Sequence, residues 1–204
     1  MADRRHRLLC AACLVLWLAL VACATPAKRV REAQDEFNRG ASLELTRKTV
    51  QGGEAEGSAA AFAHYTRART LATDVIAEHE TDLKQNELYG QALTIQALST
   101  WRLGDQRRAL EGCGRVVALA AEVEDEAAVA TRDEAMCRSL RALIDVDNLA
   151  TQARGLESLP PAERQGKLAE ILDHAARTRR SLATEAARLP PGHEYHRYVV
   201  QAQA

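Results

Sequence analysis

Aromatic residues make up only 4% of this chain, and isoleucine and valine are modest in number beside abundant alanine. Strands favour aromatic and β-branched side chains, whereas alanine is the strongest helix former. The composition therefore predicts helices and argues against a sheet. The chain also lacks a large excess of charge of one sign, because it carries 27 basic and 28 acidic side chains. Without a basic face, the chain has no electrostatic basis for binding nucleic acid.

Motifs for phosphate binding and nucleophilic catalysis are missing as well. The glycine pairs Gly52-Gly53 and Gly112, Gly114 have neither the following lysine nor the spacing of a phosphate-binding loop. Ser139 and Ser181 lack the flanking glycines of a nucleophile elbow. We therefore expect no catalytic residue and no enzyme.

Metal-binding patterns are weak. The segment 193–196 (HEYH) lacks the i, i+4 histidine pair of zinc proteases. Asp145 and Asp147 fall on different faces of a helix, which favours solvated carboxylates. Three further histidines stand singly on expected helices, where we expect hydrogen-bonded or exposed roles: His64, His79 and His174. We expect no metal site and no cofactor.

An apolar run lies close to the N-terminus. Residues 3–7 (DRRHR) are basic, and residues 8–22 (LLCAACLVLWLALVA) contain no charge, proline or glycine and end in small residues. This order is typical of a secretory signal. Fifteen helical residues would rise only about 22 Å, short of the roughly 30 Å hydrocarbon core, so a spanning helix is the weaker interpretation.

Leu20-Val21-Ala22-Cys23 closes this run and resembles the lipobox of bacterial lipoproteins. In that family the cysteine is joined to diacylglycerol, the signal is cleaved just before it, and a third acyl chain is usually added. The resemblance implies that Cys23 is lipidated, and two or more chains give stable anchoring. An ordinary signal peptide or an uncleaved anchor is the alternative. Ala24 stands where inner-membrane lipoproteins tend to carry aspartate, which implies the periplasmic face of the outer membrane.

Removal of residues 1–22 would leave 182 residues with 24 basic and 27 acidic side chains. That length is enough for one domain with a core. We expect the lipidated cysteine and a short tether over 23–27 and a single all-α domain over 28–204. In that domain 190–204 is either a loose tail or adds one short turn with Tyr195, Tyr198 and Val199 on one side.

Besides Cys23, the mature chain keeps Cys113 and Cys137, an even pair in an oxidising compartment. They flank a turn expected near 122–125. Two antiparallel helices meeting there would bring both cysteines to the same height, where a disulfide can form. Two buried free thiols are the alternative.

Apolar residues at helical spacing predict six helices, over 28–50, 58–79, 81–101, 106–121, 126–154 and 161–189. Ser58 is expected to cap the second, and Gly104-Asp105 to separate the third and fourth. Gly112 and Gly114 each weaken a helix, so we expect a close helix–helix approach there. On the last helix, the inward stripe is expected to comprise Leu168, Leu172, Ala175, Leu182, Ala186 and Leu189, interrupted by Arg179.

Residues 92–119 resemble a tetratricopeptide repeat: Ala97 takes the small position of its first helix, Gly104-Asp105 the turn, and Ala109 the small position of its second. Cys113 and Val116 depart from the family pattern. Residues 60–71 match only a second helix, 48 residues earlier instead of the regular period of about 34. The sequence predicts an all-α fold of antiparallel hairpins stacked in a tetratricopeptide-like array, with a plain helical bundle as the alternative.

These features predict a lipid-anchored scaffold that offers a groove to a protein partner at the cell envelope. A second hypothesis follows from the likeness to periplasmic tetratricopeptide lipoproteins that partner transporters. It is a ligand-handling accessory, favoured by a cavity lined by Phe37, Tyr65, Leu88 and Trp101. A third is a structural envelope lipoprotein without a soluble partner.

Overall fold

The computed structural model describes residues 25–49, 56–122 and 130–202, and throughout these ranges its regular structure is helical. The elements are α2 (Pro26–Thr49), α3 (Glu56–Gln85), α4 (Tyr89–Arg102), α5 (Gln106–Glu122), α6 (Thr131–Gly155), the 3₁₀ turn η1 (Leu156–Ser158), α7 (Pro161–Ala186) and α8 (Glu194–Gln201). The predicted all-α class is confirmed. The signal, the lipobox with Cys23, Gly52-Gly53 and the turn beyond Glu122 lie outside the described residues.

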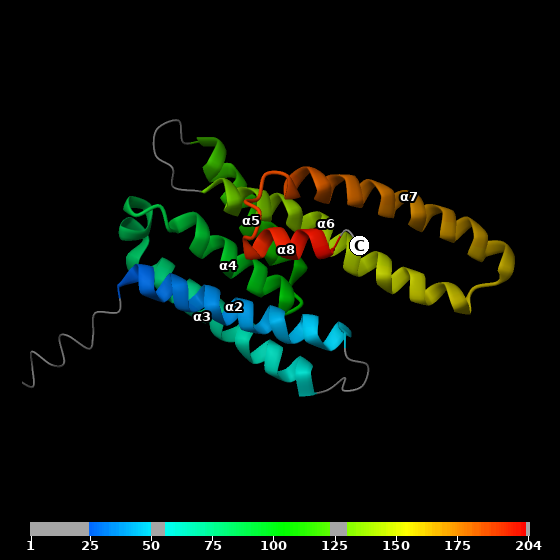
Figure 1. Ribbon diagram of the computed structural model, residues 1–204, viewed down its shortest axis with the longest axis horizontal. Helices are drawn as coiled ribbons and strands as arrows, with labels where there is room; N and C mark the ends of the chain where they lie inside the picture. The colour runs from blue at the N-terminus through cyan, green and yellow to red at the C-terminus, as the bar shows by residue number, and fades with distance from the viewer. Residues whose placement is uncertain (1–24, 50–55, 123–129, 203–204) are drawn as a thin grey trace, which may run out of the picture.

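Consecutive helices pair antiparallel and stack side by side (Figure 1). The three hairpins are α2–α3, α4–α5 and α6–α7. Helix α2 also packs on α4, α4 on α6, and α6 on α8, so alternate helices form one continuous row. Each hairpin buries the apolar side of the next, which is the arrangement predicted for a stacked array.

The turn between α4 and α5 forms as the sequence predicts. Gly104 adopts a left-handed backbone, with φ of 95°, and Asp105 follows it. The Asp105 Oδ1 atom accepts a hydrogen bond from the backbone N–H of Arg108 at 3.1 Å, so Asp105 caps α5.

The two glycines of α5 differ in their surroundings. A Cβ on Gly112 would lie 3.1 Å from the Cβ of Ala97 on α4, so the expected close approach exists at this position. A Cβ on Gly114 would meet nothing within 4 Å, and the prediction for Gly114 is wrong. Gly112 and Ala97 together let the two helices of this hairpin approach closely.

The end of α3 differs from the prediction. The backbone leaves helical geometry at His79 (φ −137°, ψ 30°), where the sequence predicts a break, but helix resumes and runs to Gln85. The chain turns instead at Glu87, with φ of 57°. Leu83 is fully buried, and its carbonyl accepts a hydrogen bond from Leu88 N at 2.8 Å. Burial of Leu83 holds this extra turn in the array and moves the boundary to residues 86–88.

Three smaller boundaries also shift. Helix α2 begins at Pro26, inside the expected tether, because proline suits the first turn of a helix. Helix α3 begins at Glu56, two residues before the expected cap Ser58. Helix α6 begins at Thr131, and residues 123–129 before it are not described.

Residues 194–201 form helix α8 instead of a loose tail. Tyr195 and Val199, four positions apart, are buried at 2% and 0% exposure. Tyr198 packs edge-on against Trp101 of α4, with ring centroids 6.2 Å apart. A helix of eight residues is marginal by itself, so burial of this apolar face against the array stabilises it.

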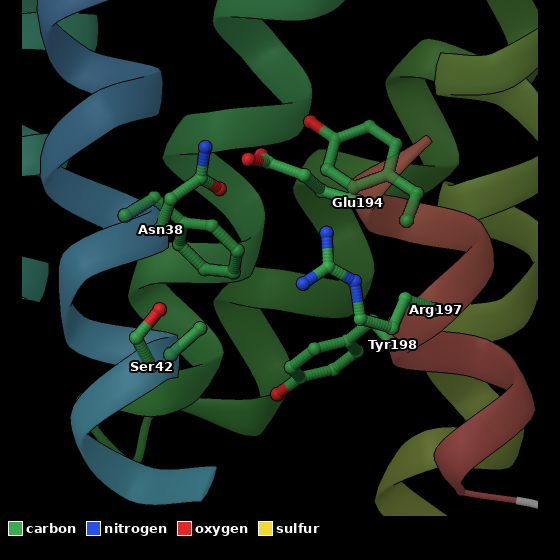
Figure 2. Close-up of a pocket in the computed structure, with 8 residues that line it drawn as sticks. Asn38, Ser42, Glu194, Arg197 and Tyr198 are labelled. Carbon is green, nitrogen blue, oxygen red and sulfur yellow. The ribbon is translucent and has the colours of Figure 1, made fainter. Parts of the chain in front are cut away.

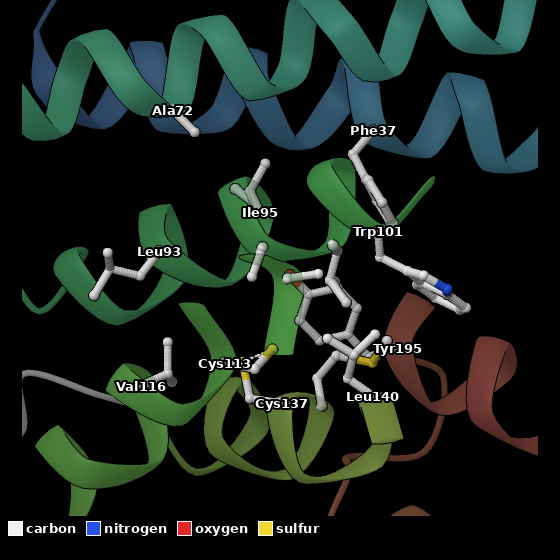
Figure 3. Packing of buried hydrophobic residues seen from close by; sticks show 14 of the residues in the cluster. Phe37, Ala72, Leu93, Ile95, Trp101, Cys113, Val116, Cys137, Leu140 and Tyr195 are labelled. Atoms are coloured by element: carbon white, nitrogen blue, oxygen red, sulfur yellow. Dashed lines mark hydrogen bonds between the residues drawn. The ribbon is translucent and has the colours of Figure 1, made fainter. Parts of the chain in front are cut away.

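The buried side chains form one continuous core across the array. Figure 3 shows Phe37, Leu93, Ile95, Trp101, Leu140 and Tyr195 within it, contributed by α2, α4, α6 and α8. Across residues 25–49, 56–122 and 130–202, no helix has both the length and the apolarity to cross a bilayer.

Candidate interaction surface

The inward face of α7 is not the predicted one over its first half. Leu168 and Leu172 are 42% and 59% exposed, whereas Ile171 and Thr178 are buried against the array. From Leu182 onward the predicted stripe and the buried face coincide. Before Leu182, α7 therefore packs Ile171 and Thr178 against the array and leaves an apolar edge with Leu168 and Leu172 open to solvent.

An open groove of about 700 Å³ lies along this region, between α6 and α7. Its lining is mostly apolar and small and has no acidic side chain: Val146, Leu149, Ala150 and Ala153 from α6; Ile171, Ala175, Ala176, Thr178, Arg179 and Arg180 from α7; and Ala202. We call this feature the α6–α7 groove. Its position explains the predicted interruption at Arg179, since that residue lies on the open side of α7.

The α6–α7 groove carries positive charge without a counter-charge. Arg179 and Arg180 are exposed, and neither guanidinium makes an ion pair within the described ranges. By contrast, Arg177 on the same helix pairs with Asp173 one turn before it. The groove is therefore apolar along its floor and basic at one side.

Helix α8 already occupies the neighbouring part of this hairpin. It packs on both α6 and α7, and Ala202, just past its last residue, lines the α6–α7 groove. Amphipathic helix α8 thus covers one part of the α6–α7 hairpin, and the α6–α7 groove beside it stays open.

A second, smaller pocket lies between α2 and α8. In Figure 2, Asn38 and Ser42 project from α2, and Glu194, Arg197 and Tyr198 project from α8. Its volume is about 60 Å³, enough for one or two water molecules and far below the roughly 300 Å³ of a small-molecule site.

Beside this pocket, a buried carboxylate joins α2 to α3. Glu36 is 4% exposed and lies 2.7 Å from both His64 Nδ1 and Arg39 Nη1. Burial raises the pKa of Glu36, but the hydrogen bond and charge of His64 and the charge of Arg39 outweigh it and leave the pKa lowered. His64 thus has a hydrogen-bonded role, as the sequence predicts, and its bond to Glu36 is a structural contact between two helices.

The four residues proposed for a ligand cavity belong to the packed interior. Phe37, Tyr65 and Trp101 are at most 5% exposed, and Leu88 packs against the same core. The Phe37 and Tyr65 rings lie 5.5 Å apart, and the Tyr65 hydroxyl donates to Glu44 at 2.9 Å. Of the four, Phe37 lines the 60 Å³ pocket.

Cys113 and Cys137 are brought together as the antiparallel geometry predicts. Both side chains are buried between α5 and α6 and point toward each other in Figure 3. The Cys113 thiol donates to the Cys137 sulfur with 2.6 Å between the Sγ atoms. Both are free thiols here, and the hydrogen bond and burial raise the pKa of Cys113.

The remaining candidate residues on α6 contact neighbouring side chains or the backbone. Asp145 lies 3.6 Å from His174, and Asp147 lies 3.7 Å from Arg102. Ser139 donates to a backbone carbonyl within α6.

The other candidates for a metal or nucleophilic role are His79, His193 and Ser181. His193 Nδ1 accepts a hydrogen bond from Tyr195 N and caps α8, and His79 lies 3.7 Å from Asp82. Ser181 is exposed on α7. In the described part of the chain, no three or more His, Cys, Asp or Glu side chains are grouped to hold a metal.

Comparison with known proteins gives no relative: no family model, curated protein or solved structure matches this chain.

Proposed function

We propose that this protein is a lipid-anchored helical scaffold, held by Cys23 at the periplasmic face of a bacterial outer membrane, which binds a protein partner. The observation that carries the proposal is the exposed α6–α7 groove with its uncompensated arginines. An apolar surface of this kind on an otherwise polar protein is typical of a protein contact. Nothing in the proposal requires catalysis.

The position of the groove relative to the start of α2 supports this role. Helix α2 begins at Pro26, so only two residues stand between Cys23 and the helical body, and the three residue steps can reach at most about 10 Å. In Figure 1 the start of α2 and the α6–α7 turn lie toward opposite ends of the longest axis. Acyl chains on Cys23 would therefore hold one end of the array near the bilayer and leave the groove accessible to a partner.

The ligand-handling alternative has less support. It requires space around Phe37, Tyr65 and Trp101, but these side chains fill the core. The structural-lipoprotein alternative remains a rival hypothesis, because it needs no partner at the groove.

The anchor is tested by replacing Cys23 with alanine and following the protein in fractionated bacteria. We expect wild type in the outer-membrane fraction with labelled palmitate, and the variant as unprocessed precursor or released protein without palmitate. Cys13→Ala, in the same apolar run, is the matched control and should keep the label. An N-terminal peptide of wild type that lacks fatty acid would disprove the anchor.

The scaffold role is tested by introducing a photo-crosslinking amino acid at Leu172, on the open edge of α7. We expect one discrete adduct with an envelope protein. The same probe at Phe62, which is 44% exposed on α3, should give none. Identical patterns at both positions, or no adduct at Leu172, would favour the structural lipoprotein.

A further inference from the structure

We infer that the α6–α7 groove binds an amphipathic helix with acidic residues beside its apolar face. This inference rests on the proposed scaffold function and specifies the chemistry of the partner. It follows from three features of the described residues: the way α8 uses the same hairpin, the shape of the open part, and its charge.

Helix α8 shows what this hairpin accepts. It lays Tyr195 and Val199 into the array while packing on α6 and α7. Its eight residues span about 12 Å, whereas the 25 residues of α6 span about 38 Å. Ala202, which follows the last residue of α8, lines the open groove. A second helix bound in the groove would therefore lie beyond the end of α8 on the same hairpin.

The shape of the open part suits a helix. Ala150 and Ala153 on α6 and Ala175 on α7 line it, and small side chains let a third helix approach within the usual 8–10 Å. Leu168 and Leu172 extend the apolar surface along α7 toward the turn. Their spacing of four places both on one edge, where they can pack beside the incoming helix.

The charge specifies the partner's polar residues. Arg179 and Arg180 lack carboxylate partners in the described ranges, and the groove lining has no acidic side chain. A helix with Glu or Asp flanking its apolar face would supply the missing charges, whereas Lys or Arg there would be repelled. A second copy of this chain docked groove to groove would add two more arginines and no carboxylate, which disfavours self-association.

The test uses the full chain in phosphatidylcholine nanodiscs and two fluorescent helical peptides of about 18 residues, near 27 Å long. Both carry leucine at i, i+3, i+4 and i+7; one has glutamates beside this face and the other has lysines. We expect saturable binding of the glutamate peptide and at least about tenfold weaker binding of the lysine peptide. Empty nanodiscs report binding to lipid alone.

Variants locate the binding site. The double variant Arg179→Glu, Arg180→Glu should lower the affinity for the glutamate peptide by about tenfold and raise the affinity for the lysine peptide. Leu172→Lys should lower the affinity for both peptides. Arg141→Glu is the matched control, because Arg141 is exposed on the opposite side of α6 and does not line the α6–α7 groove; it should leave both affinities unchanged.

Each other outcome overturns the inference. Equal binding of both peptides, no binding of either, or insensitivity to the Arg179 and Arg180 reversals excludes an acidic helix. Saturable binding of a fluorescent fatty acid that displaces the glutamate peptide would indicate a lipid site. Sedimentation as a dimer that Leu172→Lys dissociates would indicate self-association. Because Cys23 acylation and the Leu172 crosslink are measured separately, the scaffold proposal can survive a negative peptide result.

Discussion

The Sγ atoms of Cys113 and Cys137 lie 2.6 Å apart, on neighbouring antiparallel helices and shielded from solvent. This separation is close to the roughly 2.05 Å of a disulfide bond. Small movements of the two side chains would therefore suffice for bonding.

We predict that the pair is oxidised in protein isolated from the envelope. A disulfide oxidant would accept two electrons and two protons from the thiols. Closing this loop of 24 residues should add about 3 kcal/mol, and reductant should lower the melting temperature by about 10 °C. Maleimide labelling in denaturant should modify Cys113 and Cys137 only after reduction.

The double variant Cys113→Ser, Cys137→Ser serves as the control, since its melting temperature should not respond to reductant. Full maleimide labelling of both cysteines in unreduced wild type would show that they remain free thiols.

Asp133 provides a second prediction, based on pH. It is fully buried on α6, neither carboxylate oxygen has a hydrogen-bond partner, and the nearest cation, Arg132, is 3.8 Å away. Burial, partly offset by the charge of Arg132, raises the pKa of Asp133 to about 6 from 3.8. Between these values the folded protein holds a proton that the unfolded chain releases, so this carboxyl lowers stability as the pH rises toward 6.

Asp133→Asn should therefore become stabilising relative to wild type as the pH rises. Its advantage in unfolding free energy should grow by up to about 3 kcal/mol between pH 4 and pH 7. Urea unfolding followed by circular dichroism at both pH values measures this difference. Asp173→Asn, an exposed carboxylate paired with Arg177, should show no comparable growth. An advantage independent of pH would mean that Asp133 ionises normally in the fold.

The helical class, the α4–α5 turn and the approach of Cys113 to Cys137 could be predicted because each depends on local pattern. Gly104 needs a left-handed backbone, Asp105 caps the next helix, and antiparallel pairing sets the height of the two cysteines. These signals lie within one hairpin or its neighbour and do not depend on the rest of the array.

The α6–α7 groove could not be predicted, because periodicity identifies apolar edges without showing which edge is covered. Leu168, Leu172 and Leu182 form a plausible single stripe, yet only Leu182 is buried. Interruption by Arg179 was the available signal that the stripe faces outward over part of its length. Likewise, Leu83 extends α3 through a tertiary contact that the local sequence does not reveal.

Gly40 gives a third prediction, one of packing. A Cβ at this position would lie 2.8 Å from Cε1 of Tyr65, whose ring is fully buried and whose hydroxyl is held by Glu44. Gly40→Ala should thus cost about 1–3 kcal/mol despite alanine's higher helix propensity. Gly166→Ala on α7, where a Cβ meets nothing within 4 Å, should instead stabilise by about 0.5–1 kcal/mol. Urea unfolding measures the stability of both variants. If Gly40→Ala and Gly166→Ala change the unfolding free energy in the same direction, the packing at Gly40 is contradicted.

The attachment of α8 gives the last prediction. Val199 is fully buried, and the Tyr195 hydroxyl donates to Gln34 Oε1 on α2 at 3.0 Å, so this short helix is held on two sides. Val199→Asp would bury an unpaired carboxylate and should release α8, because desolvating that charge exceeds what an eight-residue helix gains by docking. Amide exchange over 194–201 should then rise by about two orders of magnitude while α2–α5 stay protected. Val200→Asp, on the exposed side at 41%, should leave α8 protected.

Release of α8 should also change peptide binding. The part of the α6–α7 hairpin that α8 covers would then join the open groove, so the glutamate peptide should bind Val199→Asp more tightly than wild type. Unchanged affinity would mean that α8 and the peptide occupy unrelated surfaces.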